Sequence, residues 1–187
     1  GNVPNFALIV LLCSVEWLLA PGAAASDGVI EINQAQALAG GVTPSDTPGF
    51  PVTIDSAGSY VLTGNLYVAS PDQSAIVVNS SWATLDLGGF EVAGPGSCGP
   101  EGSTASQLTC TVSSSASGIV FNAPNSRSRV QNGTVRGFGA FGVELGGGTA
   151  ERLQVTQNAA GGISSVSSSP SVFDSQVRLN RGHGIRI

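Results

Sequence analysis

The sequence contains no methionine and no lysine, one histidine, and only 10% charged residues among 187. All seven cationic side chains are therefore arginine, and they are scattered near Arg127, Arg136 and Arg178 without forming a dense basic stripe. Nucleic acids are bound through clustered cations that neutralise phosphates. With a net charge of -5 as well, the chain is not expected to bind nucleic acid.

Long apolar runs are also missing after residue 20, where none approaches the roughly 20 residues that a membrane span needs. Glycine is abundant instead, with 26 residues among short apolar segments that Ser, Asn and Thr separate. This pattern predicts β structure with frequent turns. The 41% of hydrophobic residues is enough for one packed domain in a chain of this length.

Residues 1–25 have the layout of a signal peptide. The apolar stretch 6–20 is too short and too interrupted for a good membrane span, and Pro21, Gly22 and the small residues 23–25 follow it. We expect cleavage after Ala25, secretion to the periplasm, the cell surface or the medium, and no integral membrane span afterwards. Because an acid interrupts the stretch and no cation precedes it, a buried hydrophobic helix is the alternative.

With the leader removed, Cys98 and Cys110 are left, an even number in an exported chain. They bracket the polar, glycine-rich run 99–103 inside an insertion at 94–116. A disulfide closing this loop would stabilise the fold by roughly 2–3 kcal/mol, mainly by restricting the unfolded chain. The alternative is two free thiols in a reducing compartment. A metal site is not predicted, since the one histidine lies 73 residues beyond Cys110.

A Gly-(Ile/Val) dipeptide returns four times in the second half of the chain. It ends at Ile119, Val143, Ile163 and Ile185, with spacings of 24, 20 and 22 residues. A second apolar segment that ends near Asn or Gly lies between successive copies. An earlier copy begins 43 residues before Ile119, which is about one repeat plus the cysteine-bearing insertion.

Each unit of roughly 22 residues holds strands too short to bury a face alone. Stacking the units buries one stripe of aliphatic side chains and pairs each strand with its counterpart about 4.8 Å away. Gly and Asn are the residues best suited to the tight corners between such strands. The sequence therefore predicts an all-β fold, a single-stranded right-handed parallel β-helix. Helical solenoids and propellers have longer periods, so they fit less well.

Residues 26–50 are predicted to form an N-terminal cap and linker, with a short capping helix at 32–38. A stacked β-helix needs its first coil covered, because otherwise apolar side chains and an unpaired strand edge face water. The β-helix itself is predicted over 51–187. Because the sequence stops in mid-repeat, we expect the natural protein to continue with further coils.

Residues 84–90 read TLDLGGF, 132–139 read NGTVRGFG and 180–185 read NRGHGI. These segments resemble bacterial right-handed parallel β-helix repeat proteins of the pectin-lyase-like superfamily, with carbohydrate-binding and sugar-hydrolase repeats. The resemblance covers about residues 50–187. The resemblance implies the fold, but it hardly specifies an activity. Members of the superfamily include polysaccharide lyases, glycosidases, epimerases, tailspikes and exported proteins of unknown role.

The tripeptide 182–184, Gly-His-Gly, is similar to a motif of polygalacturonases. Those enzymes also carry paired carboxylates on the preceding coils, one to protonate the leaving oxygen and another to activate water. Here the preceding coils offer 157–158 (Gln-Asn) and 136–137 (Arg-Gly), none of which is an acid. We therefore favour His183 as a variable residue between two corner glycines over a catalytic one.

Arg136 and Arg178 share a phase of the repeat, with Thr156 between them. This predicts two guanidinium groups on one face, roughly 10 Å apart by the strand spacing. Such a face could hold a uronate or a sulfate through charge-assisted hydrogen bonds. The alternative, which we favour, is a solvated face with ordinary arginines.

Arg186 shares its phase with Glu144, where an exposed pair would contribute little to stability. The candidate ligand-binding residues are therefore Arg136, Arg178, His183 and Arg186. No catalytic set is predicted. The acids after Ser117 occupy different phases of the repeat, so a Ca²⁺-binding cluster of the kind a polysaccharide lyase uses is not predicted either.

Three other side chains are marked by the pattern. Asp86 alternates with two leucines, so it is expected to point outward and to stabilise a turn. Trp82 and Tyr67 are candidate platforms for stacking against sugars, although isolated aromatic residues on a β surface usually pack against the protein.

These observations favour an exported, non-catalytic β-helix that acts as a scaffold or surface protein. Its expected partner is a polysaccharide or a cell-surface glycan, and no cofactor is expected. The alternative is a polysaccharide lyase or glycoside hydrolase whose catalytic coils lie beyond residue 187, with Ca²⁺ in the lyase case. A trimeric adhesin or tailspike is less favoured. The sequence does not indicate an oligomeric state.

Overall fold

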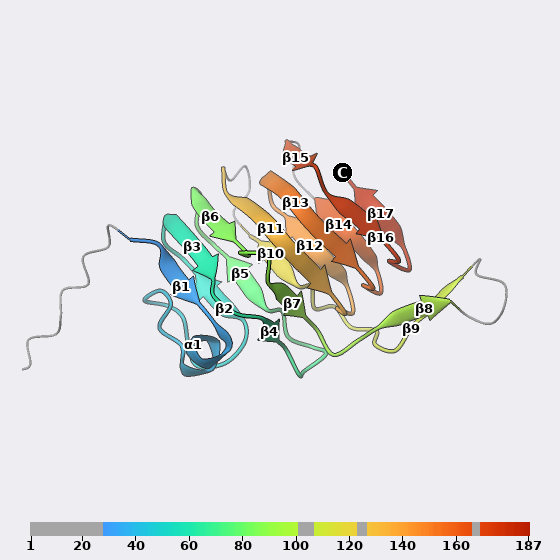
Figure 1. Cartoon of the computed structure of the whole chain (residues 1–187), viewed down its shortest axis with the longest axis horizontal. Helices are drawn as coiled ribbons and strands as arrows, with labels where there is room; N and C mark the ends of the chain where they lie inside the picture. The colour runs from blue at the N-terminus through green and yellow to red at the C-terminus, as the bar shows by residue number, and fades with distance from the viewer. Residues whose placement is uncertain (1–27, 101–106, 123–126, 166–168) are drawn as a thin grey trace, which may run out of the picture.

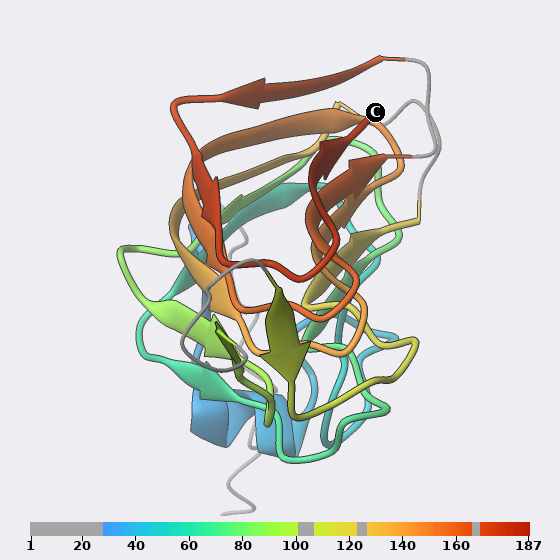
Figure 2. The same ribbon diagram turned by 90° about the vertical axis from the view of Figure 1, so that its right-hand side faces the viewer.

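The computed structural model describes residues 28–100, 107–122, 127–165 and 169–187. In this part the chain forms a parallel β-solenoid of about 5 turns, with stacked coils about 24 residues apart (Figure 1). Viewed along the stack, the coils wrap around a common interior (Figure 2). The predicted all-β parallel β-helix is therefore confirmed. The predicted signal peptide, residues 1–25, lies outside the described residues.

Strands of successive coils pair in parallel within two sheets of the described chain. In spatial order, sheet B contains β2 (Val52–Ile54), β5 (Ile76–Val78), β10 (Ile119–Phe121), β12 (Phe141–Leu145), β14 (Gly161–Ser165) and β17 (His183–Arg186). The main path of sheet A contains β1 (Ile30–Ile32), β3 (Gly58–Leu62), β6 (Ala83–Asp86), β11 (Arg129–Arg136), β13 (Gly148–Thr156) and β15 (Pro170–Phe173). Three shorter strands join sheet A beside this path: β4 (Leu66–Tyr67), β7 (Glu91–Ala93) and β16 (Gln176–Arg178).

Sheet A bends in the middle of its long strands. The first half of β11 pairs with β6 and the second half with β7, while β13 divides in the same way between β15 and β16. At the bend Asn132 and Arg152 have left-handed backbone angles, with φ of 59° and 49°, and Asp174 has 45° between β15 and β16. Each coil thus turns at the same place, and the side chains at the turn form a column.

The aliphatic anchors of the repeat line the interior of the solenoid. Ile119 pairs with Val143, and Val143 with Ile163, and these three side chains are 0%, 0% and 1% exposed. Ile185 continues the column in register with Ile163 but is 46% exposed. Its strand, β17, pairs on one side only within the described residues, so no coil covers it there.

The interior is closed at one corner by an asparagine ladder. The Asn158 side chain is completely buried, where its Oδ1 accepts the Phe138 N–H at 3.0 Å. Its backbone N–H and its Nδ2 both donate to Oδ1 of Asn180, one coil further on. The ladder pairs backbone groups that the turn of each coil would otherwise leave without a partner in a buried place.

Between residue 28 and β2 the chain forms a short helix, α1 (Gln34–Ala39). Asn33 caps it by accepting the Gln36 N–H at 3.0 Å, and Gly40 ends it with φ of 74°. The helix begins later than the predicted 32–38, because Ile32 belongs to β1 and pairs with Leu62 of β3. No helix in the described ranges combines the length and apolar character needed to cross a bilayer.

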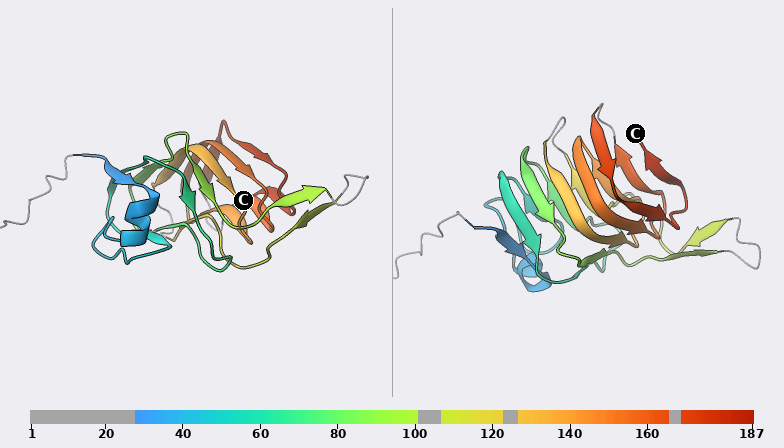
Figure 3. Two further views of the ribbon diagram at one scale, coloured as in Figure 1. Left: turned by 60° about the horizontal axis from the view of Figure 1, so that its bottom comes forward. Right: turned by 45° about the horizontal axis from the view of Figure 1, so that its top comes forward.

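The predicted insertion holds an antiparallel hairpin of β8 (Cys98–Pro100) and β9 (Leu108–Cys110). The predicted disulfide joins Cys98 and Cys110, which face each other across the two strands with Cα atoms 4.0 Å apart. The hairpin projects from the body of the solenoid and reaches past the last coil (Figures 1 and 3). At its base the backbone N–H groups of Gly94 and Gly96 donate to carbonyls at the end of β11 and just after it.

Candidate ligand-binding groove

Nine outward side chains from three successive coils form a regular array, which we call the polar grid. Its members are Asn132, Thr134 and Arg136; Arg152, Gln154 and Thr156; and Asp174, Gln176 and Arg178. Side chains alternate along each strand, so the residues between them, such as Val135 and Val155, point inward and are buried. The register places Thr134 beside Gln154 and Gln154 beside Gln176, which gives columns with a spacing of about 4.8 Å.

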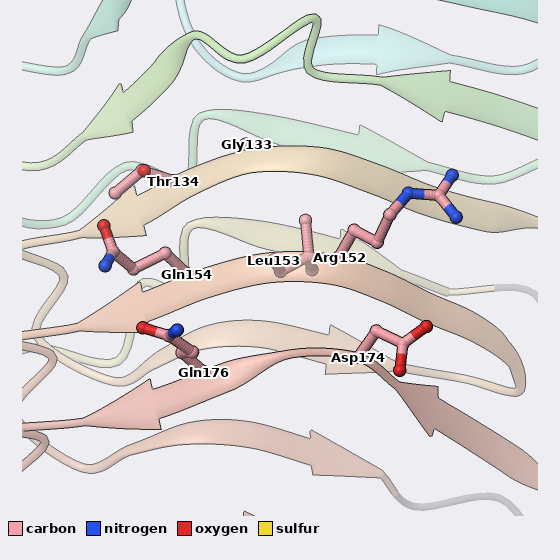
Figure 4. Close-up of a pocket in the computed structure, with 7 residues that line it drawn as sticks. All are labelled: Gly133, Thr134, Arg152, Leu153, Gln154, Asp174 and Gln176. Carbon is pink, nitrogen blue, oxygen red and sulfur yellow. The ribbon is translucent and has the colours of Figure 1, made fainter.

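A groove lies between the first and second columns of the grid. It has a volume of about 300 Å³, and its lining is Gly133, Thr134, Arg152, Leu153, Gln154, Asp174 and Gln176. Figure 4 shows Thr134, Gln154 and Gln176 along one side and Arg152 and Asp174 along the other, with Leu153 between them. A Cβ at position 133 would lie 2.7 Å from the Phe90 carbonyl oxygen. Only glycine fits there, because the added Cβ would also lie 2.4 Å from the Cβ of the buried Leu87.

An ion-pair network supports the charged side of the groove. Arg152 donates from Nε to Oδ1 of Asn132 at 2.7 Å and from a terminal nitrogen to Glu151. Glu151 also pairs with Arg129 at 3.3 Å, so its carboxylate lies between two guanidinium groups. The arginine side chains are each 49% exposed and that of Glu151 is 17% exposed. Arg152 is therefore oriented by its neighbours and still reaches solvent.

Asp86 connects this network to the preceding coil. Its carboxylate accepts the Gly88 N–H at 2.8 Å and the side-chain amides of Gln131 and Asn132, both at 2.9 Å. Burial raises the pKa of Asp86, but these three hydrogen bonds and the positive charge of Arg152 outweigh that effect, and the pKa is lowered. The side chain points outward at a turn, as the alternation predicts.

Arg136 and Arg178 lie in the third column of the grid, on either side of Thr156, as the shared phase predicts. Arg136 pairs with both carboxylate oxygens of Glu91 on the neighbouring coil. The hydrogen bond to Glu91 is the main reason that the pKa of Arg136 is raised, so the guanidinium stays charged. Arg178 is exposed and has no hydrogen bond or ion pair within the described ranges.

The other two candidates lie on sheet B, on a different face. His183 is exposed and stands opposite Gly161. Arg186 donates to the Ser164 hydroxyl at 3.3 and 3.1 Å, and its guanidinium lies 4.9 Å from the centre of the Phe141 ring. The structure therefore brings together Arg136 and Arg178 on one face and His183 and Arg186 on another, but not all four.

Trp82 and Tyr67, the candidate platforms for stacking against sugars, lie outside the groove lining, as does the exposed Phe173. Trp82 is 60% exposed, and the Arg127 guanidinium lies 4.8 Å from its ring. Tyr67 is 53% exposed, and its backbone is held on both sides by the Gln34 side chain.

Sequence reasoning missed the first two columns of the grid. The sequence does contain a signal for these columns, because polar or charged residues recur one and three positions before Val135, Val155 and Val177. It also missed the partner of Arg136, since Glu91 lies 45 residues upstream, on the far side of the insertion. No group of three His, Cys, Asp or Glu in the described part of the chain could hold a metal ion.

Comparison of the chain with protein-family models, curated proteins and solved structures gave no match. The parallel β-solenoid rests on the strand pairing described above. The resemblance to the pectin-lyase-like superfamily and a bacterial source stay predictions.

Proposed function

We propose that this protein is an exported β-solenoid that binds saccharides in the groove of the polar grid, and that binding rather than catalysis is its role. The observation that carries the proposal is the column of neutral side chains, Thr134, Gln154 and Gln176, along one side of an open polar groove.

The chemistry of the lining suits a ligand rich in hydroxyl groups. A threonine hydroxyl and a glutamine amide each donate and accept hydrogen bonds, as sugar hydroxyls do. Across the groove, Arg152 offers fixed donors and Asp174 offers acceptors. Small-molecule pockets are mostly apolar, whereas here the apolar side chain in the lining, Leu153, is only 2% exposed.

The same lining favours binding over cleavage. Glycoside hydrolysis generally uses two carboxyl groups, one on each side of the scissile bond. The groove lining contains one carboxylate, Asp174. The nearby Glu151 is held in ion pairs with Arg129 and Arg152 and is not part of the groove lining.

The proposal is tested with the full chain on a glycan array, followed by calorimetry with the saccharides that bind. Gln154→Ala is expected to weaken binding about three- to tenfold, because a hydrogen bond worth about 0.5–1.5 kcal/mol is lost. The matched control is Gln107→Ala, which removes an exposed glutamine next to the hairpin strand β9.

Two results would contradict the proposal. One is that no saccharide binds, or that Gln154→Ala binds as tightly as the unmodified chain. The other is release of new reducing ends from a bound saccharide, which would show a hydrolase or a lyase instead of a binding protein.

A further inference from the structure

We infer that the ligand of the groove is a linear, uncharged polysaccharide lying parallel to the solenoid axis, with successive sugar units facing successive coils. The inference rests on the proposed saccharide binding and adds the shape, direction and charge of the ligand.

The central column of the grid gives the direction. Thr134, Gln154 and Gln176 stand in register on β11, β13 and β16, so a line along the axis meets a neutral donor and acceptor at each of these three coils. The coil spacing is about 4.8 Å, close to the length of one pyranose unit in an extended chain. A line along the strand of a single coil meets three different groups instead: Arg152, Gln154 and Thr156.

The shape of the groove agrees with this direction. Its lining residues come from three successive coils, and both of its sides run across the strands (Figure 4). The floor between the sides is formed by Gly133 and Leu153, which lie next to each other in register. The hollow therefore extends along the stack of coils, as an extended chain in that direction requires.

The charges around the groove cancel. Arg136 is paired with Glu91, and Arg152 and Arg129 share Glu151. The charged residues of the grid and its first neighbours are four cations (Arg129, Arg136, Arg152, Arg178) and four acids (Asp86, Glu91, Glu151, Asp174). A polyuronate would gain no net attraction here, and its carboxylates would face Asp174 across the groove. The balance therefore selects an uncharged polymer over the uronate or sulfate that the arginines alone would suggest.

The test measures calorimetric affinities for neutral linear gluco-, xylo- and galacto-oligosaccharides of one to six units, with oligogalacturonates of the same lengths as the charged probes. For a neutral series that binds, affinity is expected to rise about tenfold or more from one unit to three, since each added unit reaches another coil. The neutral affinity is expected to change little between low and high salt.

Substitutions separate the two directions. Thr134→Ala and Gln176→Ala, at opposite ends of the central column, are each expected to weaken trisaccharide binding about threefold or more. Thr156→Ala, on the same strand as Gln154, is the matched control and is expected to leave the affinity unchanged. Circular dichroism of each variant shows that the fold is kept.

Three results would overturn the inference while leaving saccharide binding intact. They are equal affinity for one unit and three units, loss of binding with Thr156→Ala but not with Thr134→Ala or Gln176→Ala, and tighter, salt-sensitive binding of oligogalacturonate. Failure of every saccharide to bind would instead refute the proposed function, so the two failures are distinguishable.

Discussion

At position 162 the solenoid leaves no space for a Cβ atom. An added Cβ would lie 2.6 Å from the Gly184 carbonyl oxygen of the next coil and would collide with the Val177 side chain. At position 184, one coil further on, an added Cβ would meet only Val177, at 3.9 Å, which is an ordinary contact. The two glycines occupy equivalent positions of the repeat, but a side chain fits only at position 184.

Gly162→Ala is accordingly expected to destabilise the protein by about 1–3 kcal/mol, because the backbone of the next coil must move. Gly184→Ala is expected to be neutral or slightly stabilising, since alanine also restricts the unfolded chain. Urea unfolding followed by circular dichroism measures both variants. Equal midpoints for the two variants would show that the coils are not packed as closely as described.

Asp86 links stability to pH. Its pKa is lowered in the folded state relative to the usual value of about 3.9. The stabilisation is therefore present above pH 4 and is lost as the pH falls through the folded pKa, where the carboxylate becomes protonated. Asp86→Asn is expected to cost about 1 kcal/mol at pH 7 and less at pH 3. Unfolding midpoints of the unmodified chain and of Asp86→Asn at the two pH values check this. A stability difference between them that is larger at pH 3 than at pH 7 would contradict the prediction.

The inward or outward direction of a side chain could be predicted from the sequence, but its partners on other coils often could not. Because Asp86 lies between two leucines, its outward direction followed from the period of a strand. The pairing of Arg136 with Glu91 did not follow, because the insertion between β7 and β10 hides the period. The left-handed residues of the bend were also missed, since an arginine at that position has no sequence signal.

Among the elements, the β8–β9 hairpin stands apart from the stacked coils. Within the described ranges neither strand pairs with a strand of sheets A or B, and an isolated two-stranded hairpin is only marginally stable in water. The disulfide therefore stabilises the hairpin and its attachment, whereas the parallel ladders hold the coils.

Replacing both Cys98 and Cys110 with serine is thus expected to lower the overall stability by no more than about 2–3 kcal/mol and to leave the far-UV circular dichroism unchanged. Limited proteolysis is expected to begin within 98–110, since the hairpin loses its cross-link. Collapse of the β signal in the double variant would show instead that the solenoid depends on the hairpin.

The long strands of sheet A show what kind of element the sequence predicts well. The second apolar segment of each repeat, which contains Val135 and Val155, predicted a strand between successive Gly-(Ile/Val) copies, and the structure has these strands as β11 and β13. The merging of two short strands into β11 and β13 was not predicted, because it depends on hydrogen bonds across coils at the bend. That merging places the two sides of the groove next to each other.

At the scale of the whole molecule, the solenoid is more tightly held in its middle than at β17. Ile119, Val143 and Ile163 are at most 1% exposed, whereas Ile185 in the same column is 46% exposed. In this chain the amide protons of β12 and β14 are expected to exchange at least about tenfold more slowly than those of β17. Local opening of β17 exposes less additional apolar surface, so it costs less free energy. Hydrogen exchange measured strand by strand by NMR tests this order, and equal protection of β17 and β12 would contradict it.

The equivalence of successive coils has a consequence for protein engineering. Gly142 and Gly162 occupy the same place in neighbouring coils, and each is followed by an aliphatic residue that points inward. Joining Gly142 directly to Ile163 would remove one complete coil and restore the same Gly-aliphatic junction. Such a shortened protein would keep Thr134 and Gln176 as adjacent members of the central column. The fold thus provides a way to change the number of coils that line the groove one at a time.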